Sequence, residues 1–202
     1  MPRVIKINLS DHTLDINIRK CDYEQFDFSE IESFVRALTG TREYQFNAIK
    51  DIMIYLWGGG YKDLNDLAKK CYRKPAIQHR FQSRENLLHR LPLANRLSGV
   101  VHMATGTGKS YVMFAVAYLS IVMGKVNRVL VLGPSSTVIE RGLRGKFKDL
   151  LYGNKGRRLQ EKLPAKYRSI AVNLLDENQP IVDNSIVIEN INSIWYKDRN
   201  SI

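Results

Sequence analysis

The chain has 202 residues, of which 44% are hydrophobic and 25% are charged, and its formal net charge is +11. This composition is typical of a folded globular domain and excludes a disordered tail, and no apolar run is long enough to span a bilayer. The start of the chain lacks the pattern of a secretory leader, and Cys21 and Cys71 have neither a metal-type nor a disulfide spacing. We therefore expect a cytoplasmic protein, or a piece of one, with no membrane partner.

Residues 1–40 are predicted to form an N-terminal appendage made of a hairpin and a helix. Apolar and polar residues alternate over residues 4–9 and 14–18, on either side of a Ser-Asp-His-Thr turn, which indicates a short β-hairpin. Ser29 and Glu32 have the spacing of a helix capping box. The helix that they begin is expected to end at Gly40.

Residues 41–96 are expected to be helical. Thr41 is predicted to cap an amphipathic helix that ends at the three glycines 58–60. Residues 61–96 are basic and carry leucines at helical spacing. We interpret this second stretch as a helical subdomain inserted into the chain.

From residue 99 onward, apolar runs alternate with helical patterns. Strands are expected at residues 99–102, 126–132, 170–174 and 186–188, and helices at residues 111–123 and 138–151. Residues 134–137, Pro-Ser-Ser-Thr, are expected to form a turn and a helix cap. Such alternation is typical of an α/β fold with a parallel sheet that is covered by helices on both faces. In these folds, ligands bind at the carboxyl ends of the strands.

Residues 103–110, M-A-T-G-T-G-K-S, lie between an expected strand and an expected helix. Gly106 and Gly108 can adopt the backbone angles that direct successive N–H groups at an anion, and the dipole of the following helix also favours negative charge. Lys109 can reach the β- and γ-phosphates of a nucleotide, and the Ser110 hydroxyl can bind the magnesium ion between them. The string therefore predicts a nucleotide-binding loop.

Positive charge is concentrated in residues 141–168, where ten basic residues are opposed by two acidic ones. Such a stretch can neutralise the phosphates of a nucleic acid and give strongly salt-dependent binding. The same pattern also fits a solvated helix face followed by a basic loop. Both interpretations remain open at this point.

Three ordered segments resemble motifs of superfamily 2 helicases and translocases. Residues 103–110 resemble motif I, in which A-x-T-G-x-G-K-[ST] replaces the general phosphate loop, and this resemblance accounts for Met103 where the general pattern has glycine. Residues 42–49, R-E-Y-Q-F-N-A-I, resemble the adenine-reading Q motif. Residues 129–137 resemble motif Ia, which contacts the nucleic-acid backbone, and residues 186–191 are similar to the nucleic-acid motif that follows it.

The chain is most similar to the restriction-type branch of the DEAD/DEAH-box proteins, which includes the type III restriction enzyme Res subunit, the type I motor subunit and UvrB-like N-terminal domains. The resemblance implies a P-loop NTPase fold with a partial RecA-like parallel sheet and flanking helices. That first RecA-like domain would comprise residues 41–202, with the helical insertion at 61–96 and an incomplete C-terminal end. ATP and Mg²⁺ are the implied cofactors. Double-stranded DNA and the remainder of the motor or restriction-modification subunits are the implied partners.

The resemblance also assigns roles to individual residues. Gln45 would read adenine with its amide, which has both a donor and an acceptor, and Lys109 would be the catalytic lysine. The implied nucleotide-binding set is Gln45, Ala104, Thr105, Gly106, Thr107, Gly108, Lys109 and Ser110, with Ser110 also as the Mg²⁺ ligand. The implied nucleic-acid-binding set is Pro134, Ser135, Ser136 and Arg141. Alternatively, Gln45 is an exposed helical glutamine without a role in binding, and residues 134–137 form an ordinary helix cap.

Tyr44 and the four histidines are not assigned to the site. Tyr44 lies next to the adenine-reading glutamine, but its helical spacing also fits a core residue. The histidines show no metal-ligand spacing and are expected to be structural or surface residues: His12, His79, His89 and His102.

Hydrolysis in these motors requires a D-E-x-H or D-E-x-D box, whose acids hold magnesium and polarise the attacking water. The candidate pair, Asp176 and Glu177, continues into Asn178 and Gln179 and is better explained as a polar turn. We therefore expect the ATP-binding portion of a DNA-dependent ATPase, helicase or translocase, as a fragment without this box and the second motor domain, and with little activity alone. Two alternatives are a small, complete kinase-like P-loop enzyme and a non-catalytic nucleic-acid-binding module with a vestigial loop.

Overall fold

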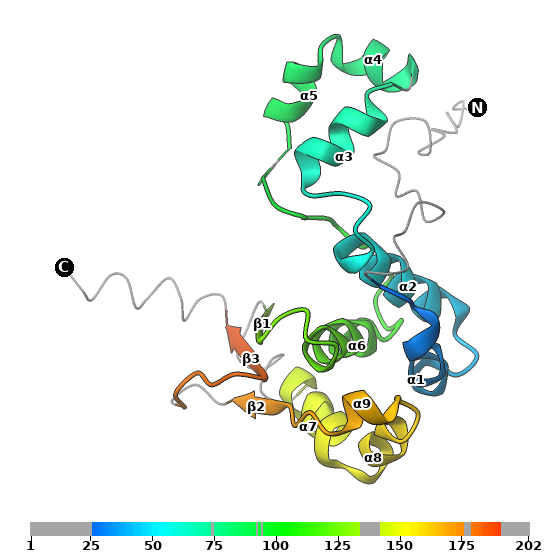
Figure 1. Cartoon of the computed structure of the whole chain (residues 1–202), viewed down its shortest axis with the longest axis vertical. Coiled ribbons are helices and arrows are strands. Elements are labelled where there is room, and N and C mark those ends of the chain that lie inside the picture. The colour runs from blue at the N-terminus through cyan, green and yellow to red at the C-terminus, as the bar shows by residue number, and fades with distance from the viewer. Residues whose placement is uncertain are drawn as a thin grey trace, which may run out of the picture. The chain divides into compact units, whose positions relative to one another are not determined.

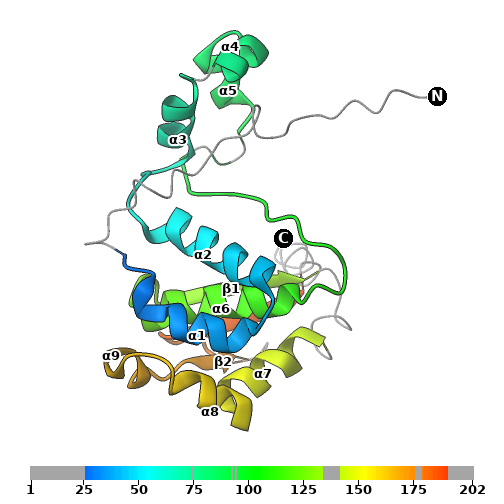
Figure 2. The same cartoon turned by 90° about the vertical axis from the view of Figure 1, so that its right-hand side faces the viewer.

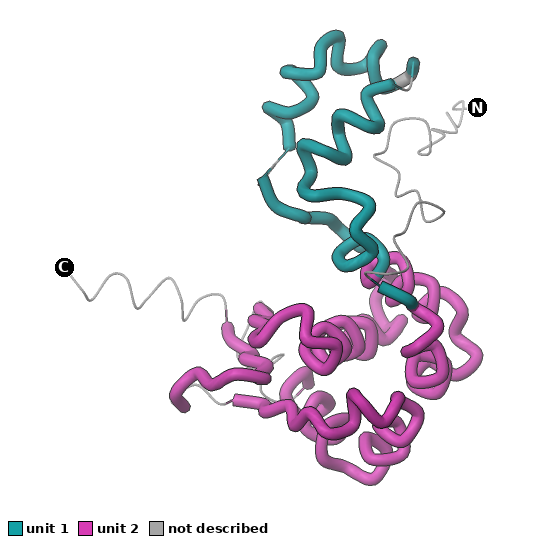
Figure 3. Tube along the Cα trace, viewed as in Figure 1, with its two compact units in different colours: residues 1–27, 54–102 teal, residues 28–53, 103–202 magenta. Residues whose placement is uncertain are grey.

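The computed structural model describes residues 26–73, 75–91, 93, 95–133, 142–175 and 179–190, except the side chain of residue 76. The chain divides into two compact units, which Figure 3 shows in different colours. Unit 1 consists of residues 1–27 and 54–102, and unit 2 consists of residues 28–53 and 103–202. The hairpin expected at residues 4–18, together with His12 and Cys21, lies outside the described residues.

The helices and strands of the two units are labelled in Figure 1. The helices α3 (Leu64–Cys71), α4 (Pro75–Phe81) and α5 (Arg84–His89) belong to unit 1, and α2 (Glu43–Trp57) begins in unit 2 and ends in unit 1. The other elements belong to unit 2: α1 (Ser29–Thr39), α6 (Lys109–Val122), β1 (Arg128–Gly133), α7 (Gly145–Tyr152), α8 (Asn154–Gln160), α9 (Ala165–Arg168), β2 (Asn173–Leu175) and β3 (Ser185–Asn190).

The short helices α3 to α5 lie in the stretch that was predicted to be helical. Asp63 caps α3 by accepting a hydrogen bond from the Asp66 backbone N–H at 2.8 Å, and Ser83 caps α5 by accepting one from Asn86 at 3.1 Å. Their apolar sides form one buried cluster, which consists of Leu64, Leu67, Ala68, Cys71, Ile77 and Leu87. Cys71 is one of the buried residues of this cluster, with 5% of its surface exposed.

Helix α1 confirms the predicted helix, but not the predicted cap. The N-cap residue is Phe28, and Ser29 is already the first helical residue. Ile31 therefore donates its backbone N–H to the Phe28 carbonyl at 3.1 Å, and the capping box is not formed because Ser29 does not occupy the cap position. Gly40 ends the helix with φ 60°, as the sequence predicted.

A chain of aromatic rings joins α1, α6 and α7 in the core of unit 2. Phe34 stacks on Tyr118 at 5.5 Å between ring centroids, and Tyr118 stacks on Phe114 at the same distance. Phe114 then meets the edge of Phe147 at 5.3 Å. Helices α1 and α6 lie side by side in unit 2 (Figure 2). The packing is typical of aromatic pairs in protein cores and fixes α6, the helix that follows the phosphate loop.

The sheet of unit 2 is parallel, in the order β1-β3-β2. In its register, Val131 of β1 is paired with Ile188 of β3, and Leu175 of β2 with Val187. Helix α6 packs against β1 and β3, and the central strand is buried at Ile186 and Ile188. The parallel arrangement agrees with the prediction and is compatible with a P-loop NTPase-like fold, since parallel neighbours require crossover connections of the kind that helices provide.

Two expectations for the sheet were wrong in the described part of the chain. Residues 99–102 form no strand, and Val100 and Val101 are 81% and 50% exposed. The run is only four residues long, and no described strand pairs with its backbone. Helices do not cover both faces of β1 either, because Leu130 and Leu132 are 55% and 42% exposed.

Candidate nucleotide-binding site

The loop that precedes α6 has the backbone shape of an anion cradle. Gly106 has φ 80° and Gly108 has φ 78°, which are left-handed values that favour glycine. Between them, Thr107 closes a turn on Ala104, whose carbonyl accepts hydrogen bonds from the Thr107 hydroxyl at 2.6 Å and from its backbone N–H at 3.4 Å. Backbone N–H groups in such a turn converge on an anion.

The start of α6 adds further donors to this loop. Gly108 is the N-cap residue, in the left-handed conformation, and no side chain caps the helix. Lys109 and Ser110 are its first two residues, and the Lys109 side chain is exposed. Because the first N–H groups of a helix have no partner within it, they are available to a phosphate group together with the Lys109 ammonium.

Two consecutive residues of α2 hold the tip of the loop. The Gln45 side-chain amide donates a hydrogen bond from Nε2 to the Thr107 carbonyl oxygen at 2.6 Å. The Tyr44 hydroxyl donates to the same oxygen at 3.2 Å. The segment that resembles the Q motif and the loop that resembles motif I therefore meet in unit 2, at one carbonyl group.

Gln45 is buried against the loop, with 1% of its surface exposed. Within the described part of the chain, its Oε1 has no hydrogen-bond partner, although a buried acceptor without a donor costs about 1–3 kcal/mol. A Cβ atom added to Gly108 would lie 2.5 Å from Gln45 Nε2. The glutamine would therefore have to shift to accommodate a side chain at position 108.

Tyr44 is the residue that the sequence reasoning missed. Its side chain is 49% exposed, so it is not a core residue. The signal in the sequence was its place next to Gln45 in the segment that resembles the Q motif. Helical spacing pointed the other way, because Tyr44 shares the periodicity of the buried Ile49 and Met53.

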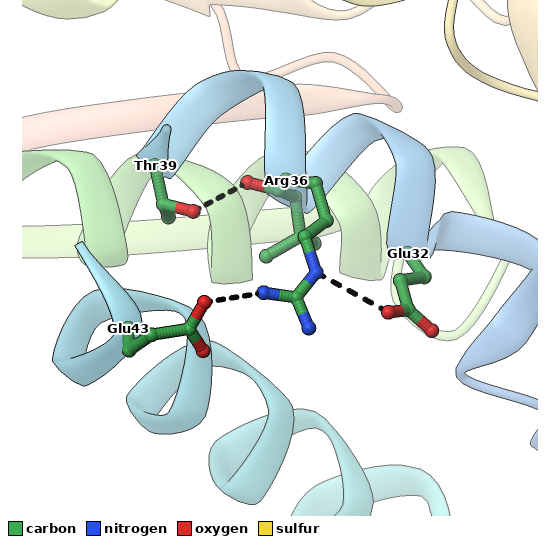
Figure 4. Close-up of polar contacts among 5 residues, drawn as sticks. Glu32, Arg36, Thr39 and Glu43 are labelled. Carbon is green, nitrogen blue, oxygen red and sulfur yellow. Dashed lines mark hydrogen bonds and ion pairs between the residues drawn. The ribbon is translucent and has the colours of Figure 1, made fainter. Parts of the chain in front are cut away.

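Arg36 of α1 contacts Glu43, the first residue of α2 (Figure 4). Tyr44 and Gln45 are the next two residues of this helix. Its Nη1 donates to Glu43 Oε1 at 2.7 Å, and its Nε donates to Glu32 Oε1 at 3.3 Å. The guanidinium group also lies over the Phe46 ring, 3.5 Å from its centroid. This cation–π contact stabilises the position of Arg36 in addition to its two ion pairs. Arg36 thereby fixes the turn of α2 that carries Tyr44 and Gln45.

Two lysines of the basic stretch lie against the first turn of α6. Lys146 of α7 donates to the Ser110 hydroxyl at 3.5 Å, which is a long hydrogen bond. Lys155 of α8 lies over the Tyr111 ring, with its ammonium 4.7 Å from the centroid. Part of the positive charge of residues 141–168 is thus located next to the phosphate loop.

The remaining predicted site residues are placed as follows. Ala104, Thr105 and Gly106 are exposed on the loop. The nucleic-acid-binding candidates Pro134, Ser135, Ser136 and Arg141 lie outside the described residues, as do Asp176, Glu177 and Asn178. Across the described ranges, no group of three or more histidine, cysteine, aspartate and glutamate residues could hold a metal ion. No helix there is long and apolar enough to cross a membrane.

The residues of the loop fit a nucleotide with its magnesium ion. The left-handed glycines and the uncapped start of α6 suit phosphate, and the Ser110 hydroxyl suits a hard cation. The unpaired Gln45 Oε1 suits a donor such as the exocyclic amine of adenine. Magnesium bound there would neutralise part of the phosphate charge.

The parallel sheet and the glycine loop before α6 are compatible with the P-loop NTPase class. A family model of the type III restriction enzyme, res subunit, matches residues 39–200. The chain belongs to this family, which confirms the resemblance seen in its motifs, and it contains an ATP-binding helicase-type motor domain. No curated protein and no solved structure matches the chain.

Proposed function

We propose that the chain binds ATP with Mg²⁺ at residues 103–110 and serves as the ATP-binding portion of a DNA-dependent helicase or translocase. The observation that carries this proposal is the pair of hydrogen bonds from Tyr44 and Gln45 to the Thr107 carbonyl. They join the segment expected to read adenine to the loop expected to bind phosphate. Chance matches at two sites 62 residues apart would have no reason to meet.

The roles of the residues follow from their chemistry. Lys109 neutralises the charge of the terminal phosphates, and the backbone N–H groups of the loop and of the first turn of α6 bind phosphate oxygens. Ser110 is the magnesium ligand that the protein supplies. Gln45 accepts a hydrogen bond from adenine with Oε1 while Nε2 holds the loop. Ala104, Thr105, Gly106, Thr107 and Gly108 complete the cradle.

DNA is the proposed polyanion partner, and the basic helices of unit 2 are its proposed contact surface. Lys166 is already paired with Glu30 at 2.6 Å, and Arg144 donates to the Ile188 carbonyl at 2.9 Å. Three other basic side chains, in α8 and the segment after it, are exposed and form no ion pair, side-chain hydrogen bond or ring contact within the described residues: Arg157, Arg158 and Lys162. These three are therefore well suited to neutralise DNA phosphates.

We propose further that this chain hydrolyses ATP slowly by itself. Its sequence contains no D-E-x-H or D-E-x-D box, and carboxylates of that box hold magnesium and polarise the attacking water in such motors. Lys109 and Ser110 can bind phosphate and magnesium, but neither supplies the carboxylate that polarises the attacking water in such motors. Nucleotide binding without rapid turnover is the expected behaviour.

Calorimetric titration of the whole chain with ATP in excess Mg²⁺ tests the binding step. The expected result is one site per chain, with an affinity that falls at least tenfold in Lys109→Ala because the charge at the phosphates is lost. Absence of binding, or unchanged binding in Lys109→Ala, would contradict the proposal. A rapid DNA-stimulated ATPase rate that disappears in Lys109→Ala would contradict the proposed slow turnover.

A further inference from the structure

The Lys146 ammonium lies beside the residue that is expected to bind magnesium. Its Nζ is 3.5 Å from the Ser110 Oγ, and Ser110 is the second residue of α6. The lysine comes from α7, 36 residues further along the chain, and no motif of the sequence singles it out. A cation at this position adds positive potential beside any anion that is bound at the loop.

The position of Lys146 is fixed by its neighbour in the sequence. Phe147 is fully buried and meets the edge of Phe114, which lies one turn after Ser110 on α6. The preceding turn is held as well, since Arg144 donates to the carbonyl of Ile188 in β3 at 2.9 Å. The two contacts tie α7 to the core on both sides of Lys146, so its exposed side chain reaches the start of α6.

Lys146 cannot keep its contact with Ser110 when the serine oxygen binds a divalent cation. Two positive charges a few ångströms apart repel each other, while the terminal phosphates of a nucleotide lie next to the cation and are strongly negative. Four flexible bonds allow the lysine to turn from the hydroxyl to a phosphate oxygen, which is a stronger acceptor for an ammonium group. The serine contact is thus the resting position of a phosphate ligand.

We propose that Lys146 is a second phosphate-binding lysine of the nucleotide site, which contacts the terminal phosphate of a nucleoside triphosphate beside Ser110. This inference rests on the proposed function, because it requires ATP to bind at residues 103–110. The contact of Lys146 with the terminal phosphate gives the site selectivity for nucleotides with more phosphates. Lys109 binds at the loop itself, and Lys146 adds a contact that a nucleoside monophosphate is too short to reach.

The test compares ATP, ADP and AMP in calorimetric titrations of the whole chain with excess Mg²⁺. In Lys146→Ala, the affinity for ATP is expected to fall about fivefold to tenfold, which corresponds to the loss of one exposed charged contact. The affinity for AMP is expected to remain unchanged, and ADP is expected to show a smaller loss than ATP. Lys146→Arg keeps the charge and is expected to retain most of the affinity for ATP.

Lys148→Ala is the matched control, because it removes the same charge from an exposed position on the same helix. It is expected to leave all three affinities unchanged. The proposal is overturned if Lys146→Ala binds ATP as the unaltered chain does or more tightly, if it loses ATP and AMP equally, or if Lys148→Ala has the same effect. Thermal melts of each variant establish that the fold is retained.

The outcome also separates this inference from the proposed function. If the unaltered chain does not bind ATP, or if Lys109→Ala binds it equally well, the loop is not the site and both proposals fail. If ATP binds and only Lys109→Ala loses affinity, the proposed function stands and the role of Lys146 is refuted.

Discussion

Gln45 donates a hydrogen bond from Nε2 to the Thr107 carbonyl oxygen at 2.6 Å, so one amide joins α2 to the phosphate loop. The same residue has a buried Oε1 without a partner in the described part of the chain. One end of the amide is therefore used for structure, and the other is a buried acceptor without a donor. Gln45→Ala removes both ends. Loss of the nitrogen is expected to affect the stability of the loop, and loss of the oxygen is expected to affect the preference between nucleotides.

Gln45→Ala is expected to reduce the preference for ATP over GTP by fivefold or more. Adenine offers an exocyclic amine as a donor, whereas guanine offers a carbonyl oxygen at the corresponding position, so an acceptor on the protein distinguishes them. Competition of ATP and GTP for the loop measures the ratio. Asn47→Ala is the control, because Asn47 is an exposed amide on the same helix. If Gln45→Ala alters thermal stability alone and leaves the ratio unchanged, the glutamine only supports the loop.

The two left-handed glycines of the loop are expected to respond differently to alanine. At Gly106, with φ 80° and no atom within 4 Å of an added Cβ, the substitution costs about 1 kcal/mol of unfolding free energy from backbone strain. At Gly108, the new Cβ would also displace Gln45 Nε2 and break its bond to Thr107. Gly108→Ala is therefore expected to cost about 2 kcal/mol or more. Urea unfolding of both variants measures the difference.

A double variant tests whether the clash with Gln45 causes the greater loss of stability in Gly108→Ala. In the double variant Gly108→Ala with Gln45→Ala, no amide nitrogen remains for the new methyl group to meet. The combined loss of stability is then smaller than the sum of the two single losses, as expected for residues in contact. Strict additivity would show that Gln45 does not restrict position 108.

Tyr118 is expected to make the free energy of unfolding decrease as the pH rises above 10. Its side chain is 3% exposed, and burial raises the pKa of its phenol to about 12 from the ordinary 10.0. Above pH 10 the unfolded state loses this proton before the folded state does. The resulting contribution to stability is complete below pH 10 and is lost as the pH rises towards 12. Tyr118→Phe is expected to remove this part of the decline.

Urea midpoints of the unaltered chain and of Tyr118→Phe, measured at pH 9 and at pH 11, test the prediction. The comparison cancels the titration of the other tyrosines and lysines, since the two proteins share them. The unaltered chain is expected to lose more stability between the two pH values than the variant does. Parallel losses would show that Tyr118 titrates normally.

Arg36→Ala is expected to weaken ATP binding more than it weakens the fold. Its ion pairs are exposed, with 44% of the arginine side chain accessible, so their loss together with the contact to Phe46 costs about 1 kcal/mol of unfolding free energy. The turn that carries Gln45 would lose its anchor, and the affinity for ATP is expected to fall severalfold. Arg84→Ala removes an exposed arginine that pairs with Glu85 at 3.6 Å and serves as the control. An equal affinity in both variants would contradict this role of Arg36.

Removal of positive charge from α8 and the segment after it is expected to weaken DNA binding in a salt-dependent way. The test variant replaces three exposed basic residues by alanine: Arg157, Arg158 and Lys162. If each contacts one phosphate, the slope of log affinity against log salt concentration decreases by roughly 3. Fluorescence polarisation with a short duplex at several salt concentrations measures it.

The control variant for DNA binding removes the same charge from exposed positions of unit 1. It replaces Lys69, Arg73 and Arg90 by alanine. Equal slopes in the two triple variants would mean that net charge alone attracts DNA. A steeper slope in the control than in the test variant is the expected result.

The sequence predicted the positions of two of the parallel strands. Residues 126–132 and 186–188 became β1 and β3, since β-branched runs of this kind favour strands. Residues 99–102 did not become a strand, because a strand also needs a neighbour that pairs with its backbone. That requirement depends on the tertiary structure and cannot be judged from four residues.

The site was predictable where it follows a local pattern. Gly106 and Gly108 have the left-handed angles that the motif requires, and Gln45 does meet the loop. Lys146 was not predictable as a neighbour of Ser110, since only the packing of Phe147 on Phe114 brings α7 to the start of α6. Within a run of ten basic residues, no sequence pattern distinguishes this lysine from the others.

The segment at residues 97–104 offers a protease an accessible stretch of the described chain. Val100 is 81% exposed, and this segment forms neither a helix nor a strand, so a protease that cleaves after valine can bind it in the extended form that proteases require. A single cut there would leave the phosphate loop attached to α6 while it frees the chain that leads into the loop. Purified protein therefore needs protection from elastase-like activity at this point before any nucleotide titration.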